Sequence, residues 1–355
     1  AESAQRGYVI SADPGYLVPY NNAQSGVQPA LNSIRHLTDD NAFQEANLVD
    51  QPFFNMEEEA GRGVFVPANT ITNQGQTNWL NSRKSNQVGR TLVLESDGEL
   101  NQWAAIIEAN LRIGKDGYVN ASYTQNMAKD NSSYNCCVAN TSTFLPVTDD
   151  PRSLNYGYSD NHFSNKVVVS GATPTFKGFT VGTTFTGSGG TRYSFIVTNG
   201  SINGDFVSNN DLAYVFDPND PVTPKAIADG INGILADPET SASAKKYLEE
   251  SFGKIAERNG GINPFSGTID LRLTKSIKIV KTQALEISAD FFNVANMLNK
   301  EWGRSYNFGG TRNLLRVTGF NQTTQRYNYS AESGVGTKPI TGTPWRLQIG
   351  LRYSF

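Results

Sequence analysis

The segment Pro344–Phe355, PWRLQIGLRYSF, alternates apolar and polar residues without interruption. Successive side chains of a β-strand point to opposite faces, so this strand has one apolar face. That face carries Trp345, Leu347, Ile349, Leu351, Tyr353 and Phe355. The opposite face is polar and includes Arg346 and Arg352. The pattern fits the inner face of a soluble sandwich, or an outer-membrane barrel whose strands face lipid on one side and a hydrated lumen on the other.

The composition favours the barrel. Hydrophobic residues make up 38% of the chain and charged residues 18%, below the ~45–50% and ~25% usual for soluble proteins. The chain has 33 glycines, 15 tyrosines and 19 phenylalanines. Few aliphatic residues and many aromatic and uncharged polar ones are typical of a barrel with a polar interior and aromatic girdles.

Other classes of protein are disfavoured. The net charge of −3 and the lack of a basic stretch interleaved with aromatics argue against nucleic-acid binding. The sequence contains no run of about 18 apolar residues, so no membrane-spanning helix is predicted. The sequence begins at Ala1 without a signal peptide, so we expect either a processed start or a part of a longer protein.

The alternation predicts about eight strands separated by connections of two lengths. Counted back from Phe355, the connections alternate long and short, and only the tight SDGE connection after Glu95 departs from this order. Outer-membrane barrels have short periplasmic turns and longer extracellular loops, so the C-terminus is predicted to be periplasmic. The predicted strands are Val88–Glu95, Asn101–Ile113, Tyr118–Met127, Phe163–Ala172, Gly178–Thr186, Thr268–Thr274, Ala284–Phe291 and the terminal one.

The predicted domain organisation follows from these strands. Residues 88–355 are expected to form C-terminal barrel strands with long extracellular loops at 128–162, 187–267 and 292–343, and residues 1–87 to be mainly an extracellular loop region. One helix is predicted inside the middle loop, with Asp237 as N-cap, Pro238 in its first turn and Gly260-Gly261 at its end. Slipping the terminal strand by one residue would place its two arginines in lipid, at about 2–4 kcal/mol each near the midplane.

Four segments resemble the C-terminal part of TonB-dependent outer-membrane receptors of the Oar-like type, which carry a carboxypeptidase-regulatory-like domain. The segments are RYSFIVTNGSINGDFVSNNDLAYVF, SAKKYLEESFGKIAERNGGINPFSGTIDLRLTK, LEISADFFNVANMLNKEWG and WRLQIGLRYSF. The block Asp290–Gly303 is the most specific of them. Nothing in the chain resembles a plug or a TonB box, which lie N-terminal in that family.

The resemblance implies an all-β transmembrane antiparallel barrel of about 22 strands around a plug, of which this chain supplies about eight C-terminal strands. It implies energised uptake of an unidentified ligand across the bacterial outer membrane. The partners would be outer-membrane lipids, the barrel-assembly machinery that reads Phe355, and the TonB complex through N-terminal parts outside this chain. The sequence leaves open whether a surface lipoprotein or other outer-membrane subunits are further partners.

Two other functions remain open. A self-contained eight-stranded outer-membrane barrel would have an adhesive or structural role, because side chains fill an interior of that size. A soluble sugar-binding sandwich would not sort its connections by length.

No set of catalytic residues is recognisable, so no enzyme is predicted. His36 and His162 lie in polar sequence and are interpreted as surface residues, and the carboxylates of MEEEAGRG (Met56–Gly63) as a solvated loop. Adjacent Cys136 and Cys137 could form a strained vicinal disulfide, although two unlinked loop thiols are the preferred interpretation.

Candidate calcium ligands lie between Asn203 and Asp220. Calcium prefers several oxygen ligands at short spacing, and the carboxylates are Asp205, Asp211, Asp217 and Asp220. The segment lacks the periodicity of an EF-hand. The preferred alternative is a loop of hydrogen-bonded Asx-turns.

Overall fold

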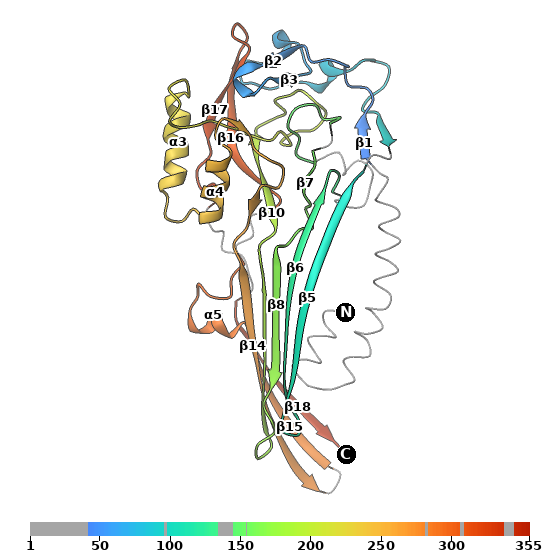
Figure 1. The fold of residues 1–355 in the computed structure, drawn as a ribbon, viewed down its shortest axis with the longest axis vertical. Helices are drawn as coiled ribbons and strands as arrows, with labels where there is room; N and C mark the ends of the chain where they lie inside the picture. Colours follow the sequence, from blue (N-terminus) through green and yellow to red (C-terminus); the bar gives the residue numbers. More distant parts are fainter. Residues whose placement is uncertain are drawn as a thin grey trace.

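The computed structural model describes residues 42–95, 98–133, 145–153, 155–280, 283–305, 309–336 and 344–355. This part of the chain is mostly β-sheet with a few short helices. Figure 1 shows an elongated molecule in which a long sheet occupies the end that contains the C-terminus, and a smaller mixed domain occupies the other end. The prediction of a mainly β protein is confirmed.

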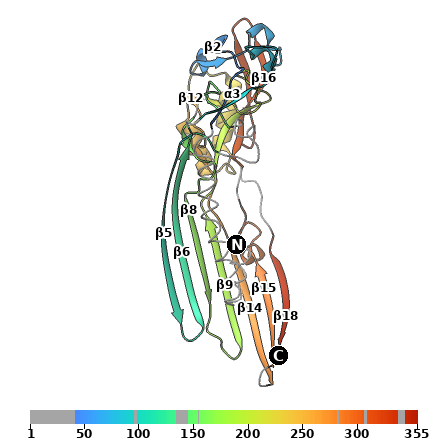
Figure 2. The same cartoon turned by 90° about the vertical axis from the view of Figure 1, so that its right-hand side faces the viewer.

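The long sheet is antiparallel throughout. Its order is β18-β15-β14-β9-β8-β6-β5, and the two-residue β7 (Gly157–Tyr158) pairs with the end of β6. Figure 2 shows the strands side by side from β5 to β18. Their bounds are β5 Leu100–Ile113, β6 Gly117–Asp130, β8 Asn165–Ala172, β9 Phe179–Ser188, β14 Ser266–Val280, β15 Gln283–Phe292 and β18 Arg346–Ser354.

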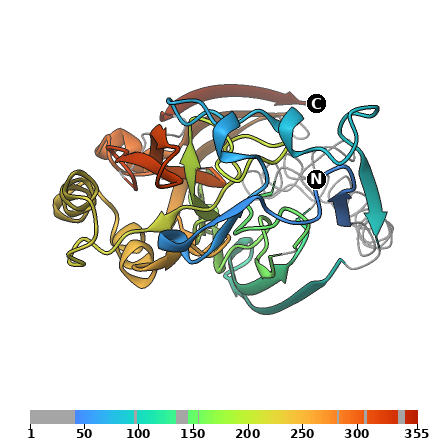
Figure 3. The same ribbon diagram turned by 90° about the horizontal axis from the view of Figure 1, so that it is seen from above.

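The sheet is open. Within the described residues β5 and β18 each have one strand neighbour, and every residue of β5 is exposed. Seen along the long axis in Figure 3, β5 (teal) and β18 (dark red) lie on opposite sides of the molecule.

Connections differ between the two ends of the sheet. Residues 114–116, 173–178 and 281–282 join neighbouring strands at the C-terminal end, whereas the connections at the other end run from 131 to 164, 189 to 265 and 293 to 345. The predicted strand Val88–Glu95 does not belong to the long sheet. Within it, residues Leu92–Glu95 form β4, which pairs with β1 (Ala42–Glu45) and not with β5.

The two longest connections contain regular structure beyond the one predicted helix. They form a four-stranded sheet of order β13-β10-β16-β17, in which β10 and β16 run parallel. We call this sheet, the helices packed on it and the N-terminal segment 46–82 the upper domain. Its strands are β10 Arg192–Thr198, β13 Gly261–Ile262, β16 Thr311–Asn321 and β17 Arg326–Ala331, with short pairs β2 Phe54–Met56 with β3 Arg62–Val64 and β11 Tyr214–Val215 with β12 Lys254–Ile255.

The upper domain has its own hydrophobic core. The central residues of β10 are buried, and Phe195 stacks on Tyr247 with ring centroids 4.4 Å apart. Met56, Val64 and Ile71 from the N-terminal segment join the same core. Part of the described residues of 1–87 therefore packs on this core.

Two longer helices cover this core instead of the one predicted. α3 (Lys225–Ala236) lies against β17, and α4 (Ala242–Glu250) contributes Tyr247 to the core. α4 begins at the N-cap Ser241, because the predicted cap Asp237 instead accepts a hydrogen bond from the Glu239 N–H in a turn. A third helix, α5 (Val294–Leu298), follows β15, and short 3-10 helices are η2 Glu57–Glu59, η3 Ala68–Thr70 and η4 Trp79–Ser82. None of the helices in the described ranges has the length and apolar character needed to cross a membrane.

A buried ion pair joins the long sheet to the upper domain. Arg258 donates to the side chain of Asp130, at the end of β6, with an N···O distance of 2.5 Å, and to the Asp130 carbonyl. The two side chains are only 1% and 6% exposed. Arg258 also donates to the Ser133 hydroxyl at 3.2 Å. This contact fixes the upper domain on the end of the sheet.

Candidate functional site

The register of the long sheet gives it one continuous apolar face. Residues paired across antiparallel strands point to the same side. Ile349 pairs with Ala289, which pairs with Leu273. At the other edge Ile107 pairs with Tyr123. The face is exposed, and the side chains most accessible on it belong to the predicted terminal set, with Ile349 73% and Phe355 93% exposed. All six of Trp345, Leu347, Ile349, Leu351, Tyr353 and Phe355 are exposed.

Exposed aromatic residues lie near both ends of this apolar face. Trp103, Trp345 and Phe265 lie near the upper domain. Phe176, Phe179, Tyr353 and Phe355 lie at the end that contains the C-terminus.

The opposite face is mostly polar, and it is less exposed on the central strands β14 and β15, whereas Ile106 of β5 on the same face is 61% exposed. Arg272 approaches Asp290 at 3.4 Å and Glu286 at 3.9 Å, and Glu286 pairs in register with Arg352 of the terminal strand. Ser170 and Ser288 on this face are 5% and 6% exposed. Most charged side chains of the sheet thus lie on this face, although Lys275 and Thr183 lie on the apolar one.

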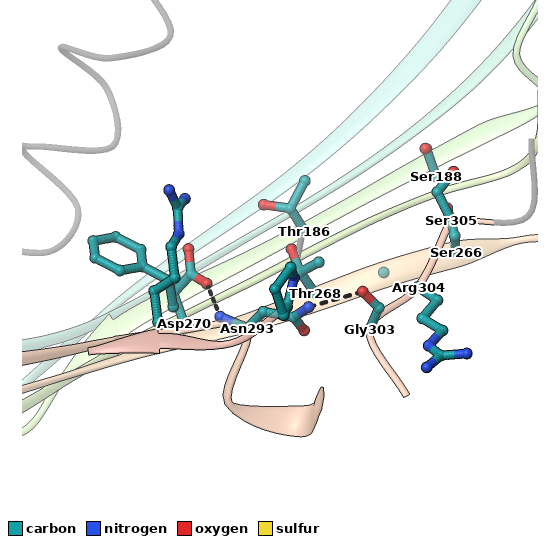
Figure 4. A pocket seen from close by; sticks show the side chains of 13 residues that line it. Thr186, Ser188, Ser266, Thr268, Asp270, Asn293, Gly303, Arg304 and Ser305 are labelled. Atoms are coloured by element: carbon teal, nitrogen blue, oxygen red, sulfur yellow. Dashed lines mark hydrogen bonds between the residues drawn. The ribbon is translucent and has the colours of Figure 1, made fainter. Parts of the chain in front are cut away.

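A polar pocket of about 290 Å³ lies on this face, near the upper domain (Figure 4). Asp270 accepts a hydrogen bond from the Asn293 N–H at 2.8 Å, and the Asn293 amide donates to the Gly303 carbonyl at 2.9 Å. Asn293 has φ 53°, a left-handed conformation that asparagine tolerates better than most residues. The lining combines hydroxyl groups with Arg304 and Arg346, so it can hydrogen-bond a small polar solute.

The four candidate calcium ligands do not form one cluster. Asp205 and Asp211 are buried in the upper domain, whereas Asp217 and Asp220 line a different, solvent-accessible cavity. Across the described ranges, no group of three or more His, Cys, Asp or Glu side chains is arranged to hold a metal ion.

The Asp205 carboxylate is bound within its own loop. It accepts hydrogen bonds from the Val207 N–H at 2.8 Å, the Ser201 hydroxyl and the Asn210 amide. Asp211 accepts from the Ile202 N–H at 2.9 Å. This is the hydrogen-bonded turn structure that was the alternative to calcium.

Burial changes the protonation of these carboxyls. Burial, with the charge of Asp205 as the next cause, raises the pKa of Asp211 to about 7. Burial likewise raises the pKa of Asp205. Two negative charges in this buried site would repel each other, so the folded state is most stable when at least one of the two carboxyls is protonated.

The carboxylates of the MEEEAGRG segment have different environments. Glu57 is exposed, as predicted, but Glu59 is buried, and the prediction of a solvated loop is wrong for it. Glu59 accepts hydrogen bonds from Arg62 at 3.1 Å and from the Tyr329 hydroxyl at 2.5 Å. Arg62, also buried, donates further to the carbonyls of Thr148 and Leu212. The Glu59–Arg62–Tyr329 cluster joins segments distant in sequence, and only the three-residue spacing of Glu59 and Arg62 signals it locally.

His162 is buried, so the prediction of a surface histidine is wrong. Its Nδ1 accepts the Ala128 N–H at 3.2 Å, and Arg192 lies 3.2 Å from Nε2. Burial and the charge of Arg192 lower the pKa of His162 to about 4, so the ring is neutral near pH 7. His36 and the Cys136–Cys137 pair lie outside the described residues.

Comparison with known proteins gives one family match, at the N-terminal end of the chain. A family model for the CHASE3 domain matches residues 1–51, most of which lie outside the described residues. No curated protein matches the chain. The long sheet and the upper domain are therefore interpreted from their own chemistry.

Proposed function

We propose that this chain forms part of the wall of a TonB-dependent transporter in the bacterial outer membrane, with the upper domain on the extracellular side. The observation that carries this proposal is the exposed apolar face that continues in register across the long strands of the sheet, opposite a polar face. In water such a face would be a large aggregation-prone patch. Against acyl chains it is the surface of lowest free energy.

The dimensions support the same conclusion. β5 has 14 residues, which at about 3.4 Å per residue gives about 48 Å. Tilted by about 40°, as strands of membrane barrels are, it would still span a hydrocarbon core of about 30 Å. Exposed aromatic residues at both ends of the apolar face match the two interfacial girdles of such barrels.

The open edges support a larger barrel over the self-contained eight-stranded alternative. β5 and β18 each leave one edge unpaired within the described residues, and in lipid every backbone polar group must be satisfied. Further strands from the remainder of a longer receptor would complete the wall. In this proposal the short connections and the C-terminus lie in the periplasm, and the polar face lines a hydrated lumen. The protein would move its ligand by gating, without covalent catalysis.

Neighbouring residues of β18 provide the test. In a variant with Cys136 and Cys137 replaced by serine, single cysteines at Ile349 and Gln348 are labelled with a fluorophore, and the protein is reconstituted in vesicles. A lipid carrying a bromine on its acyl chain should quench the label at 349 strongly, and aqueous iodide should quench the label at 348. Equal quenching of both positions by iodide would refute the proposal.

The same pair of positions gives an energetic test. Ile349→Arg places a charge on the lipid face and should destabilise the reconstituted protein by about 2–4 kcal/mol if it lies near the midplane. Gln348→Arg places it on the polar face, beside existing arginines, and should cost less. If both variants unfold at the same urea concentration, the two faces do not differ as proposed.

A further inference from the structure

The upper domain contains a second cavity, of about 690 Å³, between η2, the start of α3 and the β16–β17 hairpin. α3, β16 and β17 lie at the end of the molecule opposite the C-terminus (Figure 1). The volume of the cavity falls within the range of about 300–1,000 Å³ typical of ligand sites.

One wall of the cavity is aromatic. Tyr214 and Phe216 meet edge to face with centroids 5.0 Å apart, and Phe216 lies 6.2 Å from Tyr329, which lies 6.1 Å from Tyr327. The hydroxyls of Tyr327 and Tyr329 bind the Ile202 carbonyl and Glu59, so these two rings are held in place. The wall therefore offers fixed ring surface to a ligand.

The charged residues of the lining are mostly acidic. Its one cationic side chain is Arg326, which is paired with Glu58 at 3.2 Å. The structure pairs no cationic side chain with Glu57, Asp217 or Asp220 in its described ranges. These three carboxylates thus give the cavity a negative potential.

Turn formation alone does not account for the two aspartates. Oδ1 of Asp217 accepts the Asn219 N–H at 2.9 Å, and Oδ1 of Asp220 accepts the Val222 N–H at 3.0 Å. Oδ2 of either aspartate receives no hydrogen bond from the described residues. Asparagine would form the same turns without a charge.

We infer that this cavity binds a basic peptide segment, with a guanidinium or ammonium group held between the carboxylates and the aromatic wall. A cation over an aromatic ring is attracted to its face, and an acidic cleft concentrates cations. A neutral glycan would use the rings and the hydrogen-bonding groups but would leave the three carboxylates without a counter-charge. The inference deepens the proposed function by naming the class of ligand that its outer face takes.

The test uses the full chain in detergent micelles and a fluorescein-labelled peptide of sequence Gly-Arg-Gly-Arg-Gly. The wild type should bind this peptide, bind the isosteric citrulline peptide more weakly, and lose affinity as salt is added. The double variant Glu57→Gln, Asp220→Asn should weaken binding about fivefold. Tyr214→Leu, which removes ring surface while keeping apolar volume, should weaken it about threefold.

Glu249→Gln is the matched control, because Glu249 is exposed on α4 and does not line the cavity. It should leave the affinity unchanged. Equal affinity for the arginine and citrulline peptides, or binding of the neutral oligosaccharide cellohexaose in preference to the peptide, would overturn the inference. Peptide binding in micelles does not depend on which face meets lipid, so its failure is separate from failure of the quenching experiment.

Discussion

The buried Arg258–Asp130 pair should dominate the stability of the joint between the sheet and the upper domain. Replacing Arg258 with methionine keeps much of the side-chain volume. Among the described residues it leaves the Asp130 carboxylate, which is 6% exposed, with the Ser133 hydroxyl as its side-chain donor, at 2.8 Å. Removing one partner of a buried ion pair costs about 3–5 kcal/mol. We expect Arg258→Met to destabilise the protein by that amount.

The measurement is a urea titration of the full chain in detergent, followed by near-ultraviolet circular dichroism of the aromatic core. The double variant Arg258→Met, Asp130→Asn removes both charges and should be less destabilised than the single variant. The cost of the double variant should also be smaller than the sum of the two single variants, by about 0.5–3 kcal/mol.

Arg326→Met is the control for this experiment. Arg326 also forms an ion pair, with Glu58 at 3.2 Å, but its side chain is 62% exposed. Exposed pairs contribute about 0–1 kcal/mol. If Arg258→Met is no more destabilising than Arg326→Met, or if the costs at 258 and 130 simply add, the pair does not hold the joint.

Two further predictions concern the upper domain. Gly230→Val should lower its unfolding free energy by about 1–3 kcal/mol, because a Cβ there would lie 2.5 Å from the Ala331 Cβ. Gly233→Val is the control in thermal melts, because a Cβ at position 233 would have nothing within 4 Å. The raised pKa of Asp211, about 7, means that the folded state holds a proton that the unfolded state loses, so this group makes stability fall as pH rises from about 3.8 to 7. His162, with its pKa lowered to about 4, makes stability rise between pH 4 and 6.5. Asp211→Asn and His162→Gln should therefore change the slope of unfolding free energy against pH in opposite directions. Equal slopes in the two variants would contradict both assignments.

The strands of the long sheet could be predicted because their signal is local. Each needs only a period-two pattern and a turn, and the observed strands begin within a few residues of the predicted ones. β14 shows the limit. The predicted strand ends at Thr274, but β14 continues to Val280, with the charged Lys275 on its apolar face. The Lys275 ammonium lies 4.0 Å from the centre of the Phe179 ring and donates to the Lys177 carbonyl, so its stem covers apolar surface while its charge reaches the edge of the sheet.

The upper domain could not be predicted in the same way because its contacts are non-local. β10 and β16 pair in parallel although more than a hundred residues separate Ser194 from its partner Thr311. Short apolar runs such as the one in β10 do not distinguish a buried strand from a loop or a helix segment. α3 begins after Pro224 without a side-chain cap and contains two glycines, so the local signals for a helix start are missing.

The two halves of the molecule accommodate polar groups in different ways, and this decides where each kind of site can form. In the sheet, most charged side chains lie on one face, with Lys275 as an exception, so a polar solute finds most of its partners along that face. In the upper domain, charges are buried in pairs such as Glu59 with Arg62. Carboxylates that have no cationic partner in the described ranges, such as Glu57, therefore carry uncompensated negative charge. Because Arg258 holds the domain on the end of the sheet opposite the C-terminus, the acidic cavity would face the exterior of a cell in which that terminus is periplasmic.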